Sequence, residues 1–174
     1  MNIFLIGYRC TGKTSVGRKL SGKLDKTFID ADIKLVEDYG ATIKDIVERE
    51  GWASFRAKEK EVLKTLCLSE NQVIATGGGV IIDDENIEIM KKNGHVIWLK
   101  ATVETIRNRI FSDQMTEEQR PSLTSKGLEN EIEETLSERS PLYTNAMDFS
   151  IDTDNVSIDL ICSEIMEKMK RIER

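Results

Sequence analysis

The chain has 174 residues, a formal net charge of -6 and 39% hydrophobic residues, values typical of one globular domain. The acidic balance argues against a general affinity for nucleic acid or anionic membranes, and no apolar run is long enough to span a bilayer. Three isolated cysteines without CxxC spacing argue against a disulfide framework or a zinc site. Because no secretory signal pattern is visible, we expect a cytoplasmic protein.

Five short apolar runs alternate with longer amphipathic segments along the chain. The runs cover residues 2–6, 27–29, 73–75, 95–99 and 149–151. This alternation predicts a parallel sheet with covering helices in one domain over residues 1–174. Apolar residues at three- and four-residue spacing between Ile158 and Met169 predict a closing helix. His95, the sole histidine, begins the fourth run, and we interpret it as structural.

The segment GYRCTGKT follows the first run and precedes a helical pattern, which is the required context for a phosphate-binding P-loop. Backbone N–H groups of such a loop surround the phosphates of a nucleoside triphosphate. Lys13 is expected to reach the β- and γ-phosphates, and Thr14 to offer its hydroxyl to Mg²⁺. The other predicted nucleotide contacts in this loop are Gly7, Cys10, Thr11, Gly12 and Ser15. The loop does not decide whether water or a second substrate accepts the γ-phosphate.

Two aspartates follow the second run in the segment FIDAD. Alternation along an extended strand predicts that Asp30 and Asp32 point to the same side, toward the phosphates. One carboxylate can then support Mg²⁺ while the other orients or deprotonates an acceptor hydroxyl. The alternative is that Asp32 caps the following helix.

Three consecutive glycines, Gly77, Gly78 and Gly79, follow the third run. A single glycine is enough for most turns, so three of them predict a backbone that a ligand approaches closely. A flexible strand-to-helix turn is the alternative.

Arg56, Arg120 and Arg139 stand out by their sequence surroundings. Together they could grip a carboxylate and neutralise a transferring phosphoryl group. Each alone could instead lie in solvent or pair with a nearby acid, as Arg56 could with Glu59.

The polar, aperiodic segment at residues 111–125 contains Arg120. A loop of this length in a compact domain predicts a lid that closes over bound substrates and limits wasteful hydrolysis. A disordered surface excursion is the alternative.

These motifs together resemble the shikimate kinase family, a group of P-loop proteins similar to nucleoside-monophosphate kinases. They appear in family order over essentially the whole chain, as GYRCTGKT, FIDAD, GWASFRAKE, TGGGV, QRPSL and ERSPLY. The resemblance implies a three-layer fold with five parallel strands in the order 2-3-1-4-5. It also implies a monomer that needs Mg²⁺ and transfers the γ-phosphate of ATP to the 3-hydroxyl of shikimate, a step of chorismate and aromatic amino acid biosynthesis.

The resemblance also implies residue roles. Asp30 would support the metal, Asp32 would act as base, and Arg120 would move with the lid toward the phosphates. Arg56 and Arg139 would clamp the shikimate carboxylate, while the glycine triplet would contact ring hydroxyls. Residues expected near adenine are Arg109, Asp154 and Asn155.

The chain departs from the family pattern at three positions. Cys10 stands where a further glycine is usual, Trp52 where glutamate is usual, and Val47 where an aromatic residue is common. Because Cys10 lies within the loop of N–H groups, we hypothesise that its thiol reacts with alkylating agents and that ATP protects it.

Two other functions compete with this interpretation. A gluconate or nucleoside-monophosphate kinase would use the same scaffold, but its acceptor would lack the arrangement of a carboxylate with vicinal hydroxyls that Arg56, Arg139 and the glycine triplet suit. A P-loop switch would hydrolyse nucleotide slowly and leave those motifs without a role.

Overall fold

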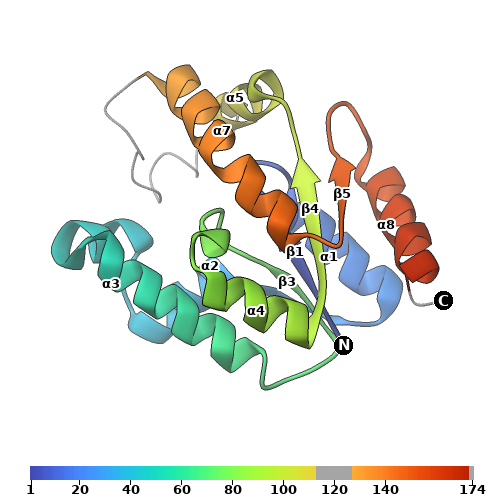
Figure 1. Ribbon diagram of the computed structural model, residues 1–174, viewed down its shortest axis with the longest axis horizontal. Helices are drawn as coiled ribbons and strands as arrows, with labels where there is room; N and C mark the ends of the chain where they lie inside the picture. Colours follow the sequence, from blue (N-terminus) through green and yellow to red (C-terminus); the bar gives the residue numbers. More distant parts are fainter. Residues whose placement is uncertain (113–126, 173–174) are drawn as a thin grey trace.

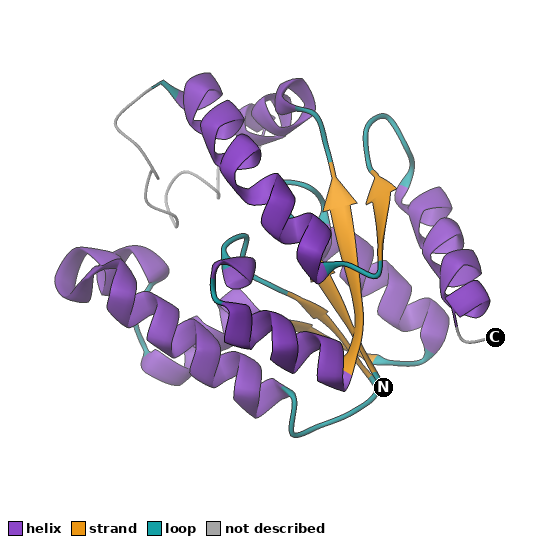
Figure 2. Ribbon diagram, in the orientation of Figure 1, coloured by secondary structure: helices purple, strands orange, loops and turns teal. Residues whose placement is uncertain are grey.

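The computed structural model describes residues 1–112 and 127–172, which form a sheet covered by helices (Figure 2). The strands are β1 (Asn2–Ile6), β2 (Thr27–Asp30), β3 (Gln72–Ala75), β4 (Gly94–Lys100) and β5 (Phe149–Asp152). All pairings are parallel, in the order β2-β3-β1-β4-β5. The predicted parallel sheet and its strand order are confirmed, and each strand extends its apolar run by at most one residue at either end.

Helices cover both faces of the sheet, which makes three layers. The helices α1 (Lys13–Leu24) and α8 (Ile158–Ile172) lie on one face, and α3 (Ile43–Leu66), α4 (Asp84–Asn93) and α7 (Leu128–Ala146) lie on the other (Figure 1). The remaining elements are α2 (Ala31–Tyr39), the 3-10 turn η1 (Val80–Ile82) and α5 (Val103–Ser112).

The central strand β1 feeds both cores because successive side chains of a strand point to opposite faces. Phe4 and Ile6 pack with residues of α3, α4 and α7, whereas Ile3 and Leu5 pack with residues of α1 and α8. The predicted closing helix is confirmed as α8, whose buried residues pack in the second of these cores. None of the described helices is long and apolar enough to cross a membrane.

The functional loops lie together because parallel strands bring their carboxyl ends to one edge of the sheet. The loop at residues 7–12 follows β1, Asp30 ends β2, and residues 76–79 follow β3. Residues 101–102 and 153–157 follow β4 and β5 at the same edge.

Candidate active site

The P-loop closes around the side chain of Lys13. Its ammonium donates hydrogen bonds of 2.7 Å to the carbonyls of both Gly7 and Tyr8, and the side chain is buried. Gly12 caps α1 with a φ of 99°, a left-handed conformation in which glycine is favoured. The loop therefore ends at the N-terminus of α1, where the backbone N–H groups and the positive end of the helix dipole bind phosphates.

A cavity of about 760 Å³ opens over the P-loop. This volume lies within the range of small-molecule sites. Its lining includes the predicted nucleotide contacts Cys10, Thr11, Gly12, Lys13, Thr14, Ser15, Arg109 and Asn155, together with both aspartates of the FIDAD motif. The structure therefore brings the P-loop, both aspartates and the expected adenine side together around one space.

The first aspartate of FIDAD links the P-loop to α2. The Thr14 hydroxyl donates to Asp30 Oδ2 at 2.8 Å, while Asp30 Oδ1 accepts from the backbone N–H groups of Asp32 and Ile33. Asp30, and not Asp32, is thus the residue that caps the helix.

Strand alternation was the wrong reason for grouping the two aspartates. β2 ends at Asp30 and α2 begins at Ala31, so Asp32 lies on the first helical turn. Both residues nevertheless line the nucleotide cavity, and Asp32 also lines a second one. The described residues contain no cluster of three acidic, histidine or cysteine side chains that could hold a metal ion by itself.

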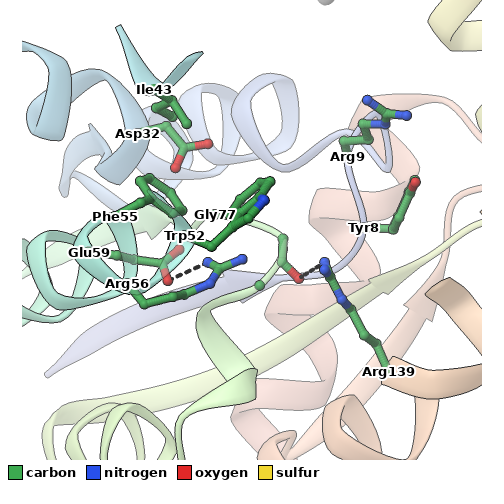
Figure 3. Close-up of a pocket in the computed structure, with 12 residues that line it drawn as sticks. Tyr8, Arg9, Asp32, Ile43, Trp52, Phe55, Arg56, Glu59, Gly77 and Arg139 are labelled. Atoms are coloured by element: carbon green, nitrogen blue, oxygen red, sulfur yellow. Dashed lines mark hydrogen bonds and ion pairs between the residues drawn. The ribbon is translucent and has the colours of Figure 1, made fainter. Parts of the chain in front are cut away.

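A second cavity, of about 70 Å³, shares Asp32 with the first in its lining. Figure 3 shows the residues that line it. We call it the acceptor cavity. Its lining consists of Tyr8, Arg9, Asp32, Ile43, Trp52, Phe55, Arg56, Glu59, Gly77, Gly78, Gly79 and Arg139. It therefore carries three arginines against two acids, a balance that favours an anionic ligand.

A break in α3 precedes four of the five residues of α3 that line this cavity. Gly51 has a φ of 84° and interrupts the helical geometry just before Trp52. From the segment after the break, Arg56 donates to Glu59 Oε2 at 2.6 Å, and its guanidinium lies 4.9 Å from the Phe55 ring centroid. The expected pairing of Arg56 with Glu59 is present, but it is largely buried at the cavity and does not lie in solvent.

Glu59 places a buried carboxyl group beside the acceptor cavity. Its side chain is only 5% exposed, and Oε1 has no hydrogen-bond partner among the described residues. Burial raises the pKa of the Glu59 carboxyl, and the charge of Asp32 adds to this, while the Arg56 guanidinium opposes it.

The glycine triplet makes room for these side chains. A Cβ on Gly79 would lie 2.2 Å from Arg56 Nη2, and one on Gly77 would lie 2.5 Å from Glu59 Oε1. The Gly78 carbonyl accepts hydrogen bonds from Arg139 and from the Tyr143 hydroxyl. The absence of Cβ atoms at Gly77 and Gly79 thus lets side chains of the site itself approach the backbone.

Two of the three predicted adenine-side residues, Arg109 and Asp154, differ in their surroundings. Arg109 lines the nucleotide cavity and donates to the carbonyls of Thr153, at 2.6 Å, and Cys10, at 3.1 Å. Asp154 does not line it, because its carboxylate accepts from the backbone and hydroxyl of Thr102, just before α5.

Part of the predicted lid lies outside the described residues. This applies to residues 113–125 and therefore to Arg120. The first two residues of the predicted loop, Phe111 and Ser112, are instead the last turn of α5.

A sequence model of the shikimate kinase family matches residues 9–170 of this chain. The chain belongs to the shikimate kinase family. Curated shikimate kinases agree with this: one from Syntrophus aciditrophicus is 40% identical, over 97% of this chain and 91% of its own length. A shikimate kinase 2 from Escherichia coli O1:K1 is 42% identical, over 94% of this chain and 92% of its own length.

Comparison with solved structures agrees with membership of the shikimate kinase family. The shikimate kinase from Acinetobacter baumannii, in complex with shikimate, superposes with a TM-score of 0.91 at 34% identity, covering 98% of this chain and 93% of the other. A gluconokinase from Sinorhizobium meliloti reaches a TM-score of 0.58 at 14% identity, over 98% of this chain and 92% of the other, and therefore shares only the fold. The resemblance found in the sequence is confirmed, and membership of this kinase family implies ATP binding.

Sequence reasoning missed several residues of the acceptor cavity in this shikimate kinase family member. Tyr8, Arg9, Ile43 and Phe55 line it without having been singled out. Tyr8 and Arg9 lie inside the P-loop motif at variable positions, so the motif itself carried no signal for them. Phe55 directly precedes Arg56 in the sequence. An aromatic residue next to a predicted carboxylate-binding arginine was the signal that could have identified it as part of the cavity wall.

Proposed function

We propose that this protein transfers the γ-phosphate of ATP to the 3-hydroxyl of shikimate, giving 3-phosphoshikimate and ADP. The observation that carries the proposal is the position of Asp32, which lines both the nucleotide cavity and the acceptor cavity. A carboxylate at this boundary can meet the acceptor hydroxyl where the phosphoryl group arrives. The reaction would belong to the biosynthesis of chorismate and aromatic amino acids.

The acceptor end is assigned from charge and geometry. Arg56 is held by Glu59 at 2.6 Å and Arg139 by the Gly78 carbonyl at 3.2 Å, so both guanidinium groups are fixed at the cavity wall. Guanidinium groups bind carboxylates strongly and with a defined orientation. We assign the shikimate carboxylate to Arg56 and Arg139, and its ring hydroxyls to the backbone at Gly77, Gly78 and Gly79.

The nucleotide end is assigned from the P-loop. When ATP binds, Lys13 replaces its hydrogen bonds to the carbonyls of Gly7 and Tyr8 with contacts to the β- and γ-phosphates. The N–H groups at the start of α1 bind the remaining phosphate oxygens. Arg109 and Asn155 line the adenine side. Asp154, next to Asn155, accepts hydrogen bonds from Thr102 just before α5. Arg120, in the proposed lid, completes the charge neutralisation.

Mg²⁺ fits the residues at the end of β2. The Thr14 hydroxyl and Asp30 carboxylate lie 2.8 Å apart, and they are the hard oxygen ligands that Mg²⁺ prefers alongside substrate phosphates. Thr14 would bind the ion directly and Asp30 would support it. When bound, the ion neutralises charge on the phosphates.

Phosphoryl transfer then follows from positioning. The 3-hydroxyl oxygen forms a bond to the γ-phosphorus as the bond to the β-γ bridging oxygen breaks and ADP leaves. Asp32 accepts the hydroxyl proton as general base. We further propose that the protein works as a single-domain cytoplasmic monomer, with no nucleic acid or membrane partner, in keeping with its net charge of -6.

The test is ADP formation from Mg-ATP with shikimate, quinate, gluconate, nucleoside monophosphates or no acceptor. Shikimate-dependent turnover is expected. Asp32→Asn should lower kcat by about 100-fold or more, and Arg139→Ala should raise the KM for shikimate. Arg107→Ala, which removes an exposed pair with Glu129, is the control. ADP release independent of any acceptor would contradict the proposal and indicate an ATPase or switch.

A further inference from the structure

A buried ion pair joins the P-loop to α7. Arg9 Nη2 donates to Glu131 Oε1 at 2.6 Å, across 122 residues of sequence. Glu131 is 1% exposed and Arg9 is 13% exposed. A buried ion pair seldom gains stability over an apolar pair, because both charges lose their hydration. The pair therefore calls for a role other than stabilisation.

Arg9 has a hydrogen-bond donor left over at the acceptor cavity. While Nη2 is bound to Glu131, the buried Nε has no acceptor among the described residues. Arg9 lines the acceptor cavity but not the nucleotide cavity. Figure 3 shows Arg9 on the side of the cavity opposite Arg56. Because buried donors are almost always satisfied, an unpaired N–H of a residue in the cavity wall points to an acceptor that a bound ligand supplies.

Glu131 itself does not line the acceptor cavity. It lies on α7, eight residues before Arg139, and about two helical turns separate the two positions. The helix α7 thus contributes to the acceptor cavity in two ways. Arg139 lines the cavity directly, and Glu131 binds the guanidinium of Arg9, which lines it.

We propose that Glu131 is a positioning residue for the acceptor: it orients Arg9 so that the Nε hydrogen is donated to an oxygen of the bound hydroxy-carboxylate. The inference rests on the proposed function, because it takes shikimate as the acceptor. It assigns Glu131 to acceptor binding and not to nucleotide binding, since Arg9 lies outside the nucleotide cavity.

The experiment measures dissociation constants for shikimate and for ATP by calorimetry, together with KM and kcat, in Glu131→Gln, Arg9→Lys and the double variant. Glu131→Gln should weaken shikimate binding about tenfold and leave the ATP constant within about twofold. Because Glu131 acts through Arg9, the double variant should bind shikimate no more weakly than Arg9→Lys alone. Glu129 lies on the same helix as Glu131 and forms an exposed ion pair with Arg107 of α5. Glu129→Gln is therefore the matched control and should change neither constant.

Several outcomes would overturn the inference. Equal losses of shikimate and ATP binding would mean a general structural role, and additive losses in the double variant would mean that Glu131 does not act through Arg9. If Glu131→Gln does not fold, Arg9→Lys carries the test, and unchanged shikimate binding there contradicts the inference. A parent protein that makes no ADP in response to shikimate would instead refute the proposed function.

Discussion

The guanidinium of Arg56 lies directly against the backbone of Gly79, where a Cβ atom would stand 2.2 Å from Nη2 and 2.6 Å from Cζ. Both atoms belong to a group that is also tied to Glu59, so Arg56 cannot move aside without losing that ion pair. The conformation of the proposed carboxylate clamp therefore depends on a missing methyl group in a neighbouring loop.

Gly79→Ala should displace Arg56 and raise the KM for shikimate by about 10- to 100-fold, the loss expected for charged hydrogen bonds. The KM for ATP should stay within about twofold, because Gly79 does not line the nucleotide cavity. Steady-state kinetics with each substrate varied in turn measures both values. Gly22→Ala is the control, since a Cβ there meets nothing within 4 Å. An unchanged KM for shikimate in Gly79→Ala would mean that Arg56 does not bind the acceptor.

Glu59 should make the protein less stable as the pH rises. Burial raises the pKa of its carboxyl above the ordinary value of 4.5, so the folded state binds this proton more tightly than the unfolded chain. The free energy of unfolding should therefore fall as the pH rises from about 4.5 through the folded pKa. Glu59→Gln should remove this fall. Urea unfolding between pH 4.5 and 8.5 measures the difference between variant and parent.

Glu85→Gln is the control for that experiment. Hydrogen bonds from Lys64 and Lys60 lower the pKa of Glu85 to about 2, so its stabilising effect is lost only as the pH falls below about 4.5. Its difference from the parent should be constant between pH 5.5 and 8.5. If the free energy of unfolding depends on pH in the same way in Glu59→Gln and in the parent, the pKa of Glu59 is not raised on folding, and the prediction is wrong.

Local patterns were enough to predict the sheet and the P-loop. The strand runs and the GYRCTGKT motif depend on neighbouring residues, and the strand order followed from the family resemblance. Asp32 was placed at the phosphate end for the wrong reason, because β2 ends at Asp30, two residues earlier than strand alternation required, where Asp30 accepts hydrogen bonds from the backbone of Asp32 and Ile33. Local sequence did not reveal which of two aspartates would serve as the cap.

Contacts between distant segments could not be predicted. Arg9 and Glu131 are separated by 122 residues, and nothing in either local pattern indicates the other. Glu59 was noticed only as a surface partner of Arg56, because burial depends on how α3, η1 and the glycine triplet pack together. The chemistry of the acceptor cavity thus depends on tertiary packing as much as on motifs.

Asp154 should contribute to stability and not to nucleotide affinity. Asp154→Ala removes hydrogen bonds from Thr102 before α5 and should lower the free energy of unfolding by about 1 kcal/mol, the usual net value of a hydrogen bond. The KM for ATP should stay within about twofold, whereas Arg109→Ala should raise it about tenfold. Thermal unfolding and ATP kinetics measure the two effects. Asp152→Ala removes an exposed acid from the preceding strand and serves as the control.

An increase in the KM for ATP in Asp154→Ala, with stability unchanged, would contradict this assignment. It would support the role near adenine that the family resemblance implies for Asp154.

Cys10 should be the cysteine that alkylating agents modify first. It lines the nucleotide cavity and is partly exposed, whereas Cys162 is buried. Burial raises the pKa of Cys67 to about 11 and also raises the pKa of Cys162, so both thiols offer little of the reactive thiolate. Iodoacetamide at pH 8 should therefore label Cys10 preferentially and abolish kinase activity, and ATP should slow both effects. Mass spectrometry of peptides locates the label.

Cys10→Ser separates this reaction from damage elsewhere, because it keeps a side chain of similar size and should make activity resistant to iodoacetamide. Cys10→Gly tests the backbone at the same position. Residue 10 has a φ of 60°, a left-handed conformation that costs a residue with a Cβ about 1 kcal/mol more than glycine. Cys10→Gly should therefore equal or exceed the parent in stability, although the greater freedom of glycine in the unfolded chain offsets part of the gain. Equal labelling with and without ATP would contradict the placement of Cys10 in the nucleotide site, because a triphosphate bound by the P-loop must cover this thiol.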